Sequence, residues 1–422
     1  MKPSHFARAL CVASATIATS AFSPVLAQSP AAAPASAASA PLFAVRSEVG
    51  KALNEAVDLF RAGKVAEARD RVEKAQAAVA DPQAAERSVM HRLRGLFAMQ
   101  LGHMPEAAQQ LEAAIGAGAQ SPQDQLLCLE SLARVQFNLK AYPTAVDWAR
   151  KAQAAGSKSA PVQAVLVRAT YLQNDYKGTI QLLEAQDKSS PLTMEDLRIL
   201  ASSYGQTKDD ANYVRLAERL LRDHGRTEYW ADLLSRVQRQ PGWQARWDVD
   251  LFRLRFALDQ MDEAEDYLVL AEMTARAGLP AEAQKVLDAG YTKGTLGKGP
   301  AAAEHQKLRS AVTRQASDDR QSLAGVAARP AAASDARSAA STFNTGAALV
   351  AAGQAERGLE WMKAALAGPL ADPAQARLQY GQSLHLAGRT AEAAEQFKSL
   401  AAHESLGLLA RLWAAAVATR RN

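Results

Sequence analysis

The chain has 422 residues, of which 48% are hydrophobic, 22% charged and only 6% aromatic, with a formal net charge of +5 and two cysteines. This composition excludes a disordered chain, a disulfide-stapled miniprotein and the collagen-like classes. An apolar chain with so few rings fills its interior mainly with alanine and leucine, which favours closely packed helices over strand-rich sandwiches or barrels. We therefore expect an all-α protein with a large buried interior.

The N-terminal segment, 1–41, predicts an export signal followed by a linker. Lys2 and Arg8 form a basic start, residues 9–22 carry no charge, and VLA at 25–27 has the small residues of a signal-peptidase site. The uncharged run is too short to span a membrane, although a retained N-terminal anchor helix is the alternative. Residues 28–41, rich in alanine, proline and serine, have the composition of a flexible spacer. We expect cleavage after Ala27 and a periplasmic location, with no stable membrane anchor.

Cleavage would leave a nearly neutral chain with one thiol. Residues 1–27 contain Lys2, Arg8 and no acidic residue, so the net charge falls to +3. Such a small excess, spread over the whole chain, does not predict nucleic-acid binding, which requires a concentrated basic face. Cys11 leaves with the signal, and Cys128 lies among leucines. We expect Cys128 to be a small core residue rather than a reactive thiol.

A short phrase recurs along the remaining sequence. A turn-forming or polar residue is followed five positions later by a marker residue, as in AGKVAEA at 62–68, AGLPAEA at 277–283 and AGRTAEA at 387–393. The marker positions, most of them small, are Ala68, Ala107, Ala145, Thr179, Tyr213, Ala283, Gly358 and Ala393. Successive spacings among the first five markers are 39, 38, 34 and 34, which indicates a repeated unit.

A second marker lies twelve positions before the first. It falls at Ala56, Gly95, Ala133, Val167, Ala201, Ala271, Gly346 and Gly381, which are small in seven of the eight cases. Two small positions twelve apart, each on its own helix, allow two antiparallel helices to approach closely. The repeated unit is therefore predicted to be a helical hairpin, and hairpins must stack because one alone cannot bury its apolar faces.

The repeat resembles the tetratricopeptide pattern, W-x2-L-G-x2-Y in a first helix and A-x3-F-x2-A, then P, in a second. The best match is formed by Tyr380, Gly381, Leu384, Ala393, Phe397 and Leu400, and the second-helix half recurs at Ala107, Leu111, Ala114 and Pro122 and at Ala68, Val72, Ala75 and Pro82. The signature tryptophan is mostly missing, and Thr179 and Tyr213 depart from the pattern. The resemblance covers residues 45–290 and 340–405 and implies an α-solenoid of stacked antiparallel helix pairs.

Two segments interrupt the period. Residues 226–258 hold half of the six tryptophans, at Trp230, Trp243 and Trp247, around a Pro-Gly breaker, and residues 291–341 form an insertion that begins with a glycine-rich loop. The predicted organisation is a signal peptide at 1–27, a linker at 28–41, an N-terminal array at 42–225, an irregular helical unit plus a repeat at 226–292, a partly helical or disordered insertion at 293–341, and a C-terminal pair with a capping helix at 342–422. Tryptophans at a break in a solenoid are expected to fill an irregular core, with an exposed binding patch as the alternative.

The sequence contains no recognisable catalytic or metal motif. HExxH, GxSxG, CxxC and the phosphate-loop pattern are all missing, and the histidines after the signal never pair at metal-ligand spacing. Acids gather at Asp259, Asp262, Glu263, Glu265 and Asp266, where capping of a helix start and solvation explain them better than a metal or acid-base site. We therefore expect no catalytic residue, no cofactor and no metal.

The tetratricopeptide resemblance does imply a partner-binding surface, because first helices line the concave groove in such arrays. Residues three before, or one or four after, the first-helix marker face that groove. These positions, with one neighbour, are Arg92, Arg134, Asn138, Arg168, Tyr171 and Arg198. Arginine suits a partner with an acidic segment or a C-terminal carboxylate, since its fork can donate two parallel hydrogen bonds. The alternative is a solvated face with intrahelical pairs, Glu130 to Arg134 and Glu195 to Arg198.

These observations together predict a non-catalytic periplasmic scaffold that binds a protein or peptide in the groove of the solenoid. Resemblance to periplasmic tetratricopeptide proteins implies a role in cell-envelope assembly or maintenance. The alternatives are a holding chaperone for exported chains and an accessory protein of a TonB-type system. An enzyme acting on the cell wall or on exported polysaccharide is less favoured, because it needs convergent acids or nucleophiles that the sequence does not offer.

Overall fold

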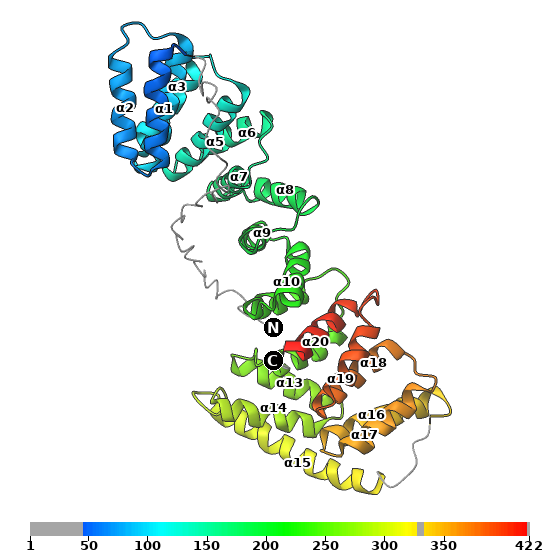
Figure 1. Cartoon of the computed structure of the whole chain (residues 1–422). Helices are drawn as coiled ribbons and strands as arrows, with labels where there is room; N and C mark the ends of the chain where they lie inside the picture. Colours follow the sequence, from blue (N-terminus) through cyan, green and yellow to red (C-terminus); the bar gives the residue numbers. More distant parts are fainter. Residues whose placement is uncertain (1–44, 327–332, 420–422) are drawn as a thin grey trace.

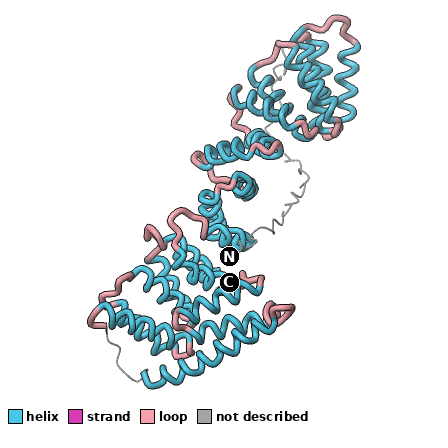
Figure 2. Tube along the Cα trace, turned by 180° about the vertical axis from the view of Figure 1, so that it is seen from behind, coloured by secondary structure: helices cyan, strands magenta, loops and turns pink. Residues whose placement is uncertain are grey.

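The computed structural model describes residues 45–326 and 333–419, and every regular element in these two ranges is a helix. The expected all-α fold of antiparallel helix pairs is confirmed (Figure 1). The predicted signal peptide, its cleavage after Ala27 and the linker lie outside the described residues. Figure 2 shows loops between successive helices within the described ranges.

The first ten helices form five successive hairpins, which we call the N-terminal array. In chain order they are α1 (Ser47–Arg61) and α2 (Val65–Ala77), α3 (Ala84–Gln100) and α4 (Met104–Gly116), α5 (Pro122–Asn138) and α6 (Tyr142–Ala154), α7 (Ala160–Leu172) and α8 (Tyr176–Asp187), and α9 (Met194–Thr207) and α10 (Asp210–His224). Each helix packs mainly on its hairpin partner and on the next hairpin. The array therefore extends step by step from the upper to the lower part of Figure 1.

The recurring phrase of the sequence is the turn inside each hairpin. The residue five positions before every second-helix marker has a left-handed backbone, with φ between 59° and 95°. It is glycine in five hairpins and Lys140, Asn174 or Lys208 in the other three. This conformation closes the first helix and redirects the chain, and glycine adopts it without the steric cost that a side chain brings.

The paired markers lie where the two helices of a hairpin touch. A Cβ added to Gly346 would lie 2.7 Å from the backbone oxygen of Gly358, and one added to Gly358 would lie 2.5 Å from the oxygen of Gly346. Gly381 approaches Phe397, and Gly95 approaches Leu111, similarly closely. Small residues are thus required at these positions, because larger ones would push the helices of a hairpin apart.

The middle segment is irregular and filled with aromatic side chains. It comprises η1 (Thr227–Tyr229), α11 (Trp230–Val237), η2 (Ala245–Trp247) and α12 (Asp248–Ala257). Trp230 and Trp247 are buried, and Trp243 is half-buried with its Nε1 donating to Asp248 Oδ1 at 2.8 Å. The expectation that these rings fill an irregular core, rather than form an exposed patch, is confirmed.

The remaining helices, together with α12, form what we call the C-terminal unit. They are α13 (Ala264–Arg276), α14 (Pro280–Lys293), α15 (Ala302–Val326), α16 (Ala336–Ala351), α17 (Ala355–Leu366), α18 (Pro373–Leu386), α19 (Thr390–Ser399) and α20 (Gly407–Thr419). Three hairpins, α13 with α14, α16 with α17 and α18 with α19, repeat the unit of the N-terminal array. The long helix α15, within the predicted insertion, packs along α14 and reaches α16.

The C-terminal unit closes back on the middle of the chain. The predicted capping helix α20 packs on α19 as an end cap would, but it also contacts α10 and α12. Arg411 on α20 forms an ion pair with Glu218 on α10, 193 residues away, with Nε 2.5 Å from Oε1. Gln375 on α18 donates to Asp250 on α12 at 2.6 Å. These contacts, which we call the closure, bring the last helices against α10 and α12 in the lower part of Figure 1.

Candidate functional site

The first helices of the N-terminal array line its inner face. Each of α1, α3, α5 and α7 touches the first helix of the next hairpin, whereas second helices of successive hairpins make at most marginal contact. Helices on the inner side of a curved stack approach one another more closely than those on the outer side, so this asymmetry identifies the inner face. All six predicted partner-binding residues lie on α3, α5, α7 or α9.

Three of the six predicted residues hold neighbouring helices together instead of standing free. Arg92 on α3 forms an ion pair with Asp124 on α5 and is buried, which lowers the pKa of the guanidinium. Arg168 on α7 forms an ion pair with Glu195 on α9. The Tyr171 hydroxyl lies 2.8 Å from the Ser202 hydroxyl, again joining α7 to α9.

The other three, Arg134, Asn138 and Arg198, are exposed. Arg134 forms no ion pair within residues 45–326 and 333–419, and Arg198 lies beside Tyr229. The intrahelical pairs of the alternative interpretation are replaced by other contacts. Glu195 pairs with Arg168 on the preceding hairpin. Glu130 accepts a hydrogen bond from Ser157 at 2.5 Å. The packing of a neighbouring segment decides where each acid points, and this is why intrahelical spacing misassigned them.

An exposed leucine extends the inner face of α5. Leu127 is 40% exposed and lies two turns before Arg134, which in turn lies one turn before Asn138. An α-helix places residues three, four and seven apart on the same side. The inner face of α5 therefore offers an apolar side chain, a cation and an amide in one row.

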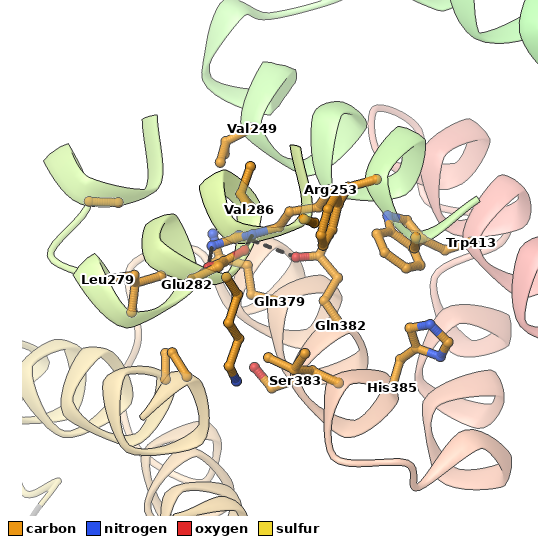
Figure 3. A pocket seen from close by; sticks show the side chains of 18 of the residues that line it. Val249, Arg253, Leu279, Glu282, Val286, Gln379, Gln382, Ser383, His385 and Trp413 are labelled. Carbon is orange, nitrogen blue, oxygen red and sulfur yellow. Dashed lines mark hydrogen bonds and ion pairs between the residues drawn. The ribbon is translucent and has the colours of Figure 1, made fainter. Parts of the chain in front are cut away.

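The sequence did not reveal a second candidate site, a cavity inside the C-terminal unit. It has a volume of about 650 Å³ and is bounded by α12, α14, α16, α18 and α20 (Figure 3). Its apolar wall includes Val249, Phe256, Leu279, Val286, Leu386 and Trp413. Its polar groups include Arg253, Glu282, Lys285, Asn344, Gln379, Gln382 and Ser383. The cavity exists because the closure brings α18 and α20 against α12.

A buried ionic network lies at one side of this cavity. Arg253 donates to Glu282 through two bonds of 2.7 Å, and its Nη1 lies 3.4 Å from the fully buried Asp250 carboxylate. Burial raises the pKa of Asp250, an effect that Arg253 and the hydrogen bond from Gln375 oppose. Burial disfavours the charge on Arg253, but Glu282 and Asp250 outweigh it and raise the pKa of the guanidinium. The network therefore holds one cation between two acids, on helices α12 and α14.

Two buried hydrogen-bond donors at the cavity lack well-formed hydrogen bonds. Gln382 is 7% exposed and accepts a bond from Arg253 through Oε1 at 3.3 Å. Its Nε2 lies toward the Asp250 carboxylate, but without the geometry of a hydrogen bond. The Nε1 of Trp413 is buried and has no hydrogen-bond partner in the described part of the chain. An unpaired buried polar atom costs free energy, but the indole nitrogens of Trp230, Trp247 and Trp361 are unpaired as well in the described residues, so these donors alone do not mark a binding site (Figure 3).

Sequence reasoning missed this cavity because its residues come from segments more than a hundred positions apart. The only local signal was Asp250 three positions before Arg253 in an otherwise aromatic segment, since a charged pair there predicts a buried ion pair. Nothing in the sequence indicated that Gln375 and Gln382 face them.

Other sequence candidates have structural roles. Cys128 is fully buried, as expected, and burial raises the pKa of its thiol. The acids at 259–266 surround the start of α13, also as expected, where Asp266 pairs with Arg255 at 2.7 Å and Asp259 with Lys293 at 3.0 Å. Among the described residues, no group of three or more histidine, cysteine or acidic side chains could hold a metal ion. No helix in this part of the chain combines the length and apolarity that a membrane crossing needs.

Comparison with known proteins gives structural neighbours only. No family profile matches the sequence, and no curated protein sequence is significantly similar to it. Similar solved structures include the Naa15/Naa10 complex bound to HypK-THB, with 13% identity, 85% of this chain and 64% of that chain covered, and a TM-score of 0.41. A tetratricopeptide repeat protein from Parabacteroides merdae has 13% identity and a TM-score of 0.35. The match covers 63% of this chain and 98% of that chain.

The TPR2AB domain of yeast Sti1, in a complex with pHSP90, has 12% identity to the chain and a TM-score of 0.28. The match covers 89% of this chain and 99% of that chain. TM-scores this low carry no argument about function, and the chain spans only 64% of the Naa15/Naa10 chain that it matches. The neighbours include tetratricopeptide repeat proteins, the class that the sequence motif predicts. The chain resembles that class in its sequence motif and in its all-α stack of paired helices.

Proposed function

We propose that the protein is a non-catalytic scaffold that binds a segment of a partner protein on the inner face of the N-terminal array. The single observation that carries this proposal is the row on α5 formed by Leu127, Arg134 and Asn138, exposed on the side where successive first helices meet. Arg198 on α9 adds a second exposed cation two hairpins away. A partner segment that combines acidic and apolar side chains complements this surface.

Fixed geometry supports the same proposal. The ion pairs Arg92 to Asp124 and Arg168 to Glu195, and the Tyr171 to Ser202 contact, each join one first helix to the next. They hold α5 and α9 in place against their neighbours, so the exposed residues on these helices are positioned before a partner arrives. A preorganised surface binds more tightly because less conformational entropy is lost on association.

Binding of labelled peptides tests the proposal. The probes are short peptides that alternate glutamate and leucine, with either a free or an amidated C-terminus, measured by fluorescence anisotropy. Replacing Arg134 and Arg198 together by alanine is expected to weaken binding by about tenfold or more, since both cations are lost. The matched control replaces Arg150 and Arg215, which are exposed on the second helices α6 and α10, and should leave the affinity unchanged. Equal losses in the two double variants would contradict an inner-face site.

We further propose that this scaffold works in the periplasm, in cell-envelope assembly or maintenance. The support is the basic start, the uncharged run and the small-residue cleavage site within segment 1–27. Expression of the full chain in a Gram-negative host, followed by N-terminal sequencing of the protein in the periplasmic fraction, tests the location. The expected first residue is Gln28. A chain that keeps segment 1–27 and stays in the cytoplasm would overturn this proposal without affecting the peptide-binding one.

A further inference from the structure

We propose that the cavity of the C-terminal unit binds a small apolar carboxylic acid, with the medium-chain fatty acids as the ligand class. The carboxylate would lie toward Lys285, and the acyl chain would lie along the apolar wall. This site is separate from the inner face of the N-terminal array, and the proposal does not depend on partner binding there.

Size and lining match such a ligand. The volume of about 650 Å³ lies within the roughly 300–1,000 Å³ of typical small-molecule sites. A single water occupies only about 30 Å³ of liquid, so one ordered water bound to a polar group would not fill this space. Phe256 and Val286 belong to a wall contributed by α12 and α14, and Leu386 and Trp413 add to it from α18 and α20. Covering this wall with an alkyl chain removes apolar surface from water, which favours binding.

One cation that lines the cavity has no carboxylate partner in the described part of the chain. Both lining carboxylates already have partners, because Glu282 is held by Arg253 and Asp259 by Lys293. Lys285, one turn after Glu282 on α14, is exposed and forms no ion pair within the described ranges. Arg253 is shared between Glu282 and the buried Asp250, so the excess acid lies on that side and the ligand carboxylate is placed at the exposed Lys285, away from the network.

The charged end of the ligand is assigned from Lys285 alone. The two donors without a well-formed bond among the described residues, Trp413 Nε1 and Gln382 Nε2, have almost no accessible surface, so a ligand in the cavity would not contact them. A carboxylate supplies the negative charge that Lys285 lacks, and the apolar wall requires the rest of the molecule to be hydrocarbon.

Isothermal titration calorimetry on the full chain tests this assignment with four probes: decanoate, octanoate, decan-1-ol and acetate. Decanoate is expected to bind with one molecule per chain. Octanoate should bind roughly tenfold or more weakly, because each methylene group contributes about fourfold. Decan-1-ol should bind more weakly than decanoate, and acetate should show no binding. Failure of decanoate to bind would overturn the proposal.

Two variants locate the ligand. Lys285→Met removes the charge at an exposed position and should weaken decanoate, but not decan-1-ol, by about fivefold. Lys307→Met on α15, exposed and away from the cavity lining, is its matched control and should change neither. Ala347→Phe on α16 fills the cavity from its wall and should abolish binding of both ligands. Its circular dichroism should stay that of the unmodified protein.

The remaining outcomes separate this site from the other proposal. Arg134→Ala with Arg198→Ala should leave decanoate binding intact, so loss of peptide binding and loss of fatty-acid binding are independent results. Decanoate affinity that survives both Lys285→Met and Ala347→Phe would place the ligand elsewhere and overturn the assignment. A peptide ending in leucine that displaces decanoate and binds more tightly would also overturn it, because the occupant would then be a protein terminus.

Discussion

The N-terminal array and the C-terminal unit are built from the same helical hairpin but differ in how far their contacts reach. In α1–α10 each hairpin touches mainly its immediate neighbours. In the C-terminal unit, Gln375 bonds to Asp250 across 125 residues, and Arg411 on α20 reaches back across 193 residues to Glu218. The same repeat therefore makes an open array at one end of the chain and a closed structure around a cavity at the other.

This difference predicts two kinds of stability. An open array behaves as a sum of units and nearest-neighbour interfaces, so it can fray from its free end. A closed unit loses several interfaces at once when any of them breaks, so it should unfold as one cooperative block. The open end suits a surface that must stay accessible to a partner segment, and the closed end suits a protected cavity.

The largest expected effect comes from removing the cation of the buried network. Arg253→Met leaves the buried Asp250 and Glu282 carboxylates without their shared partner. Breaking a buried ion pair in this way costs about 3–5 kcal/mol of unfolding free energy. Hydrogen exchange should increase across α12, α14 and α18 together, while α1–α6 stay unchanged.

The matched control is Arg276→Met on α13, where the guanidinium is exposed and its partner is only Glu272. We expect at most a few tenths of a kcal/mol from that change. A similar loss in both variants, or faster exchange confined to α12 after Arg253→Met, would contradict a cooperative closed unit.

The next effect tests hairpin packing inside the closed unit. Gly346→Ala adds only one methyl group, but its Cβ would meet the Gly358 carbonyl oxygen at 2.7 Å and the Met362 backbone nitrogen at 2.9 Å. Backbone atoms cannot move aside cheaply, so we expect a loss of about 1–3 kcal/mol, measured by urea unfolding. The same substitution at Gly325 on α15 meets no atom within 4 Å and should stabilise the helix slightly. Equal effects would show that the markers do not set the hairpin spacing.

Acid should weaken the open end first. The hydrogen bond and ion pair from Arg46 hold the pKa of Glu86 at about 2, below its ordinary value of 4.5. The depressed pKa means that this contact contributes fully above pH 4.5 and is lost as the pH falls toward 2. The pKa of Asp250 is shifted upward instead, so protonation of that group does not destabilise the closed unit.

Hydrogen exchange in α1 and α3, followed over this pH range, measures the effect. Exchange should accelerate there before it does in α12 or α18, and Glu86→Gln should remove most of the dependence on pH in α1. If hydrogen exchange accelerated at the same pH in α1 and α3 as in α12 and α18, the division into an open array and a closed unit would be contradicted.

The sequence predicted the hairpins because their packing is local. A small marker and its partner twelve positions away, such as Gly346 and Gly358, meet within one unit, and the left-handed turn between them has its own residue signature. The closure was not predictable, since the pattern of Asp250 and Arg253 does not encode a contact with Gln375 on a helix 125 residues later. The sequence predicted which helices carry the inner face, but not which of its arginines are free to bind a partner. Whether an arginine stands free depends on Asp124 or Glu195 in the next hairpin, and relative helix placement decides that.

The smallest effect concerns the turn that both regions share. Lys208 ends α9 with φ at 59°, in the position where five other hairpins have glycine. A side chain costs about 1–2 kcal/mol in that conformation, and the larger unfolded-chain entropy of glycine offsets part of the gain from removing it. Lys208→Gly should therefore raise the unfolding free energy of the array by about 0.5–1 kcal/mol, measured by urea unfolding. Lys188 also ends a helix, α8, but with a right-handed backbone at φ −72°. Lys188→Gly should lower the unfolding free energy instead, because a right-handed backbone carries no strain for glycine to relieve and glycine makes the unfolded chain more flexible. A stabilising effect of both substitutions would mean that the shared turn is not what limits the hairpin.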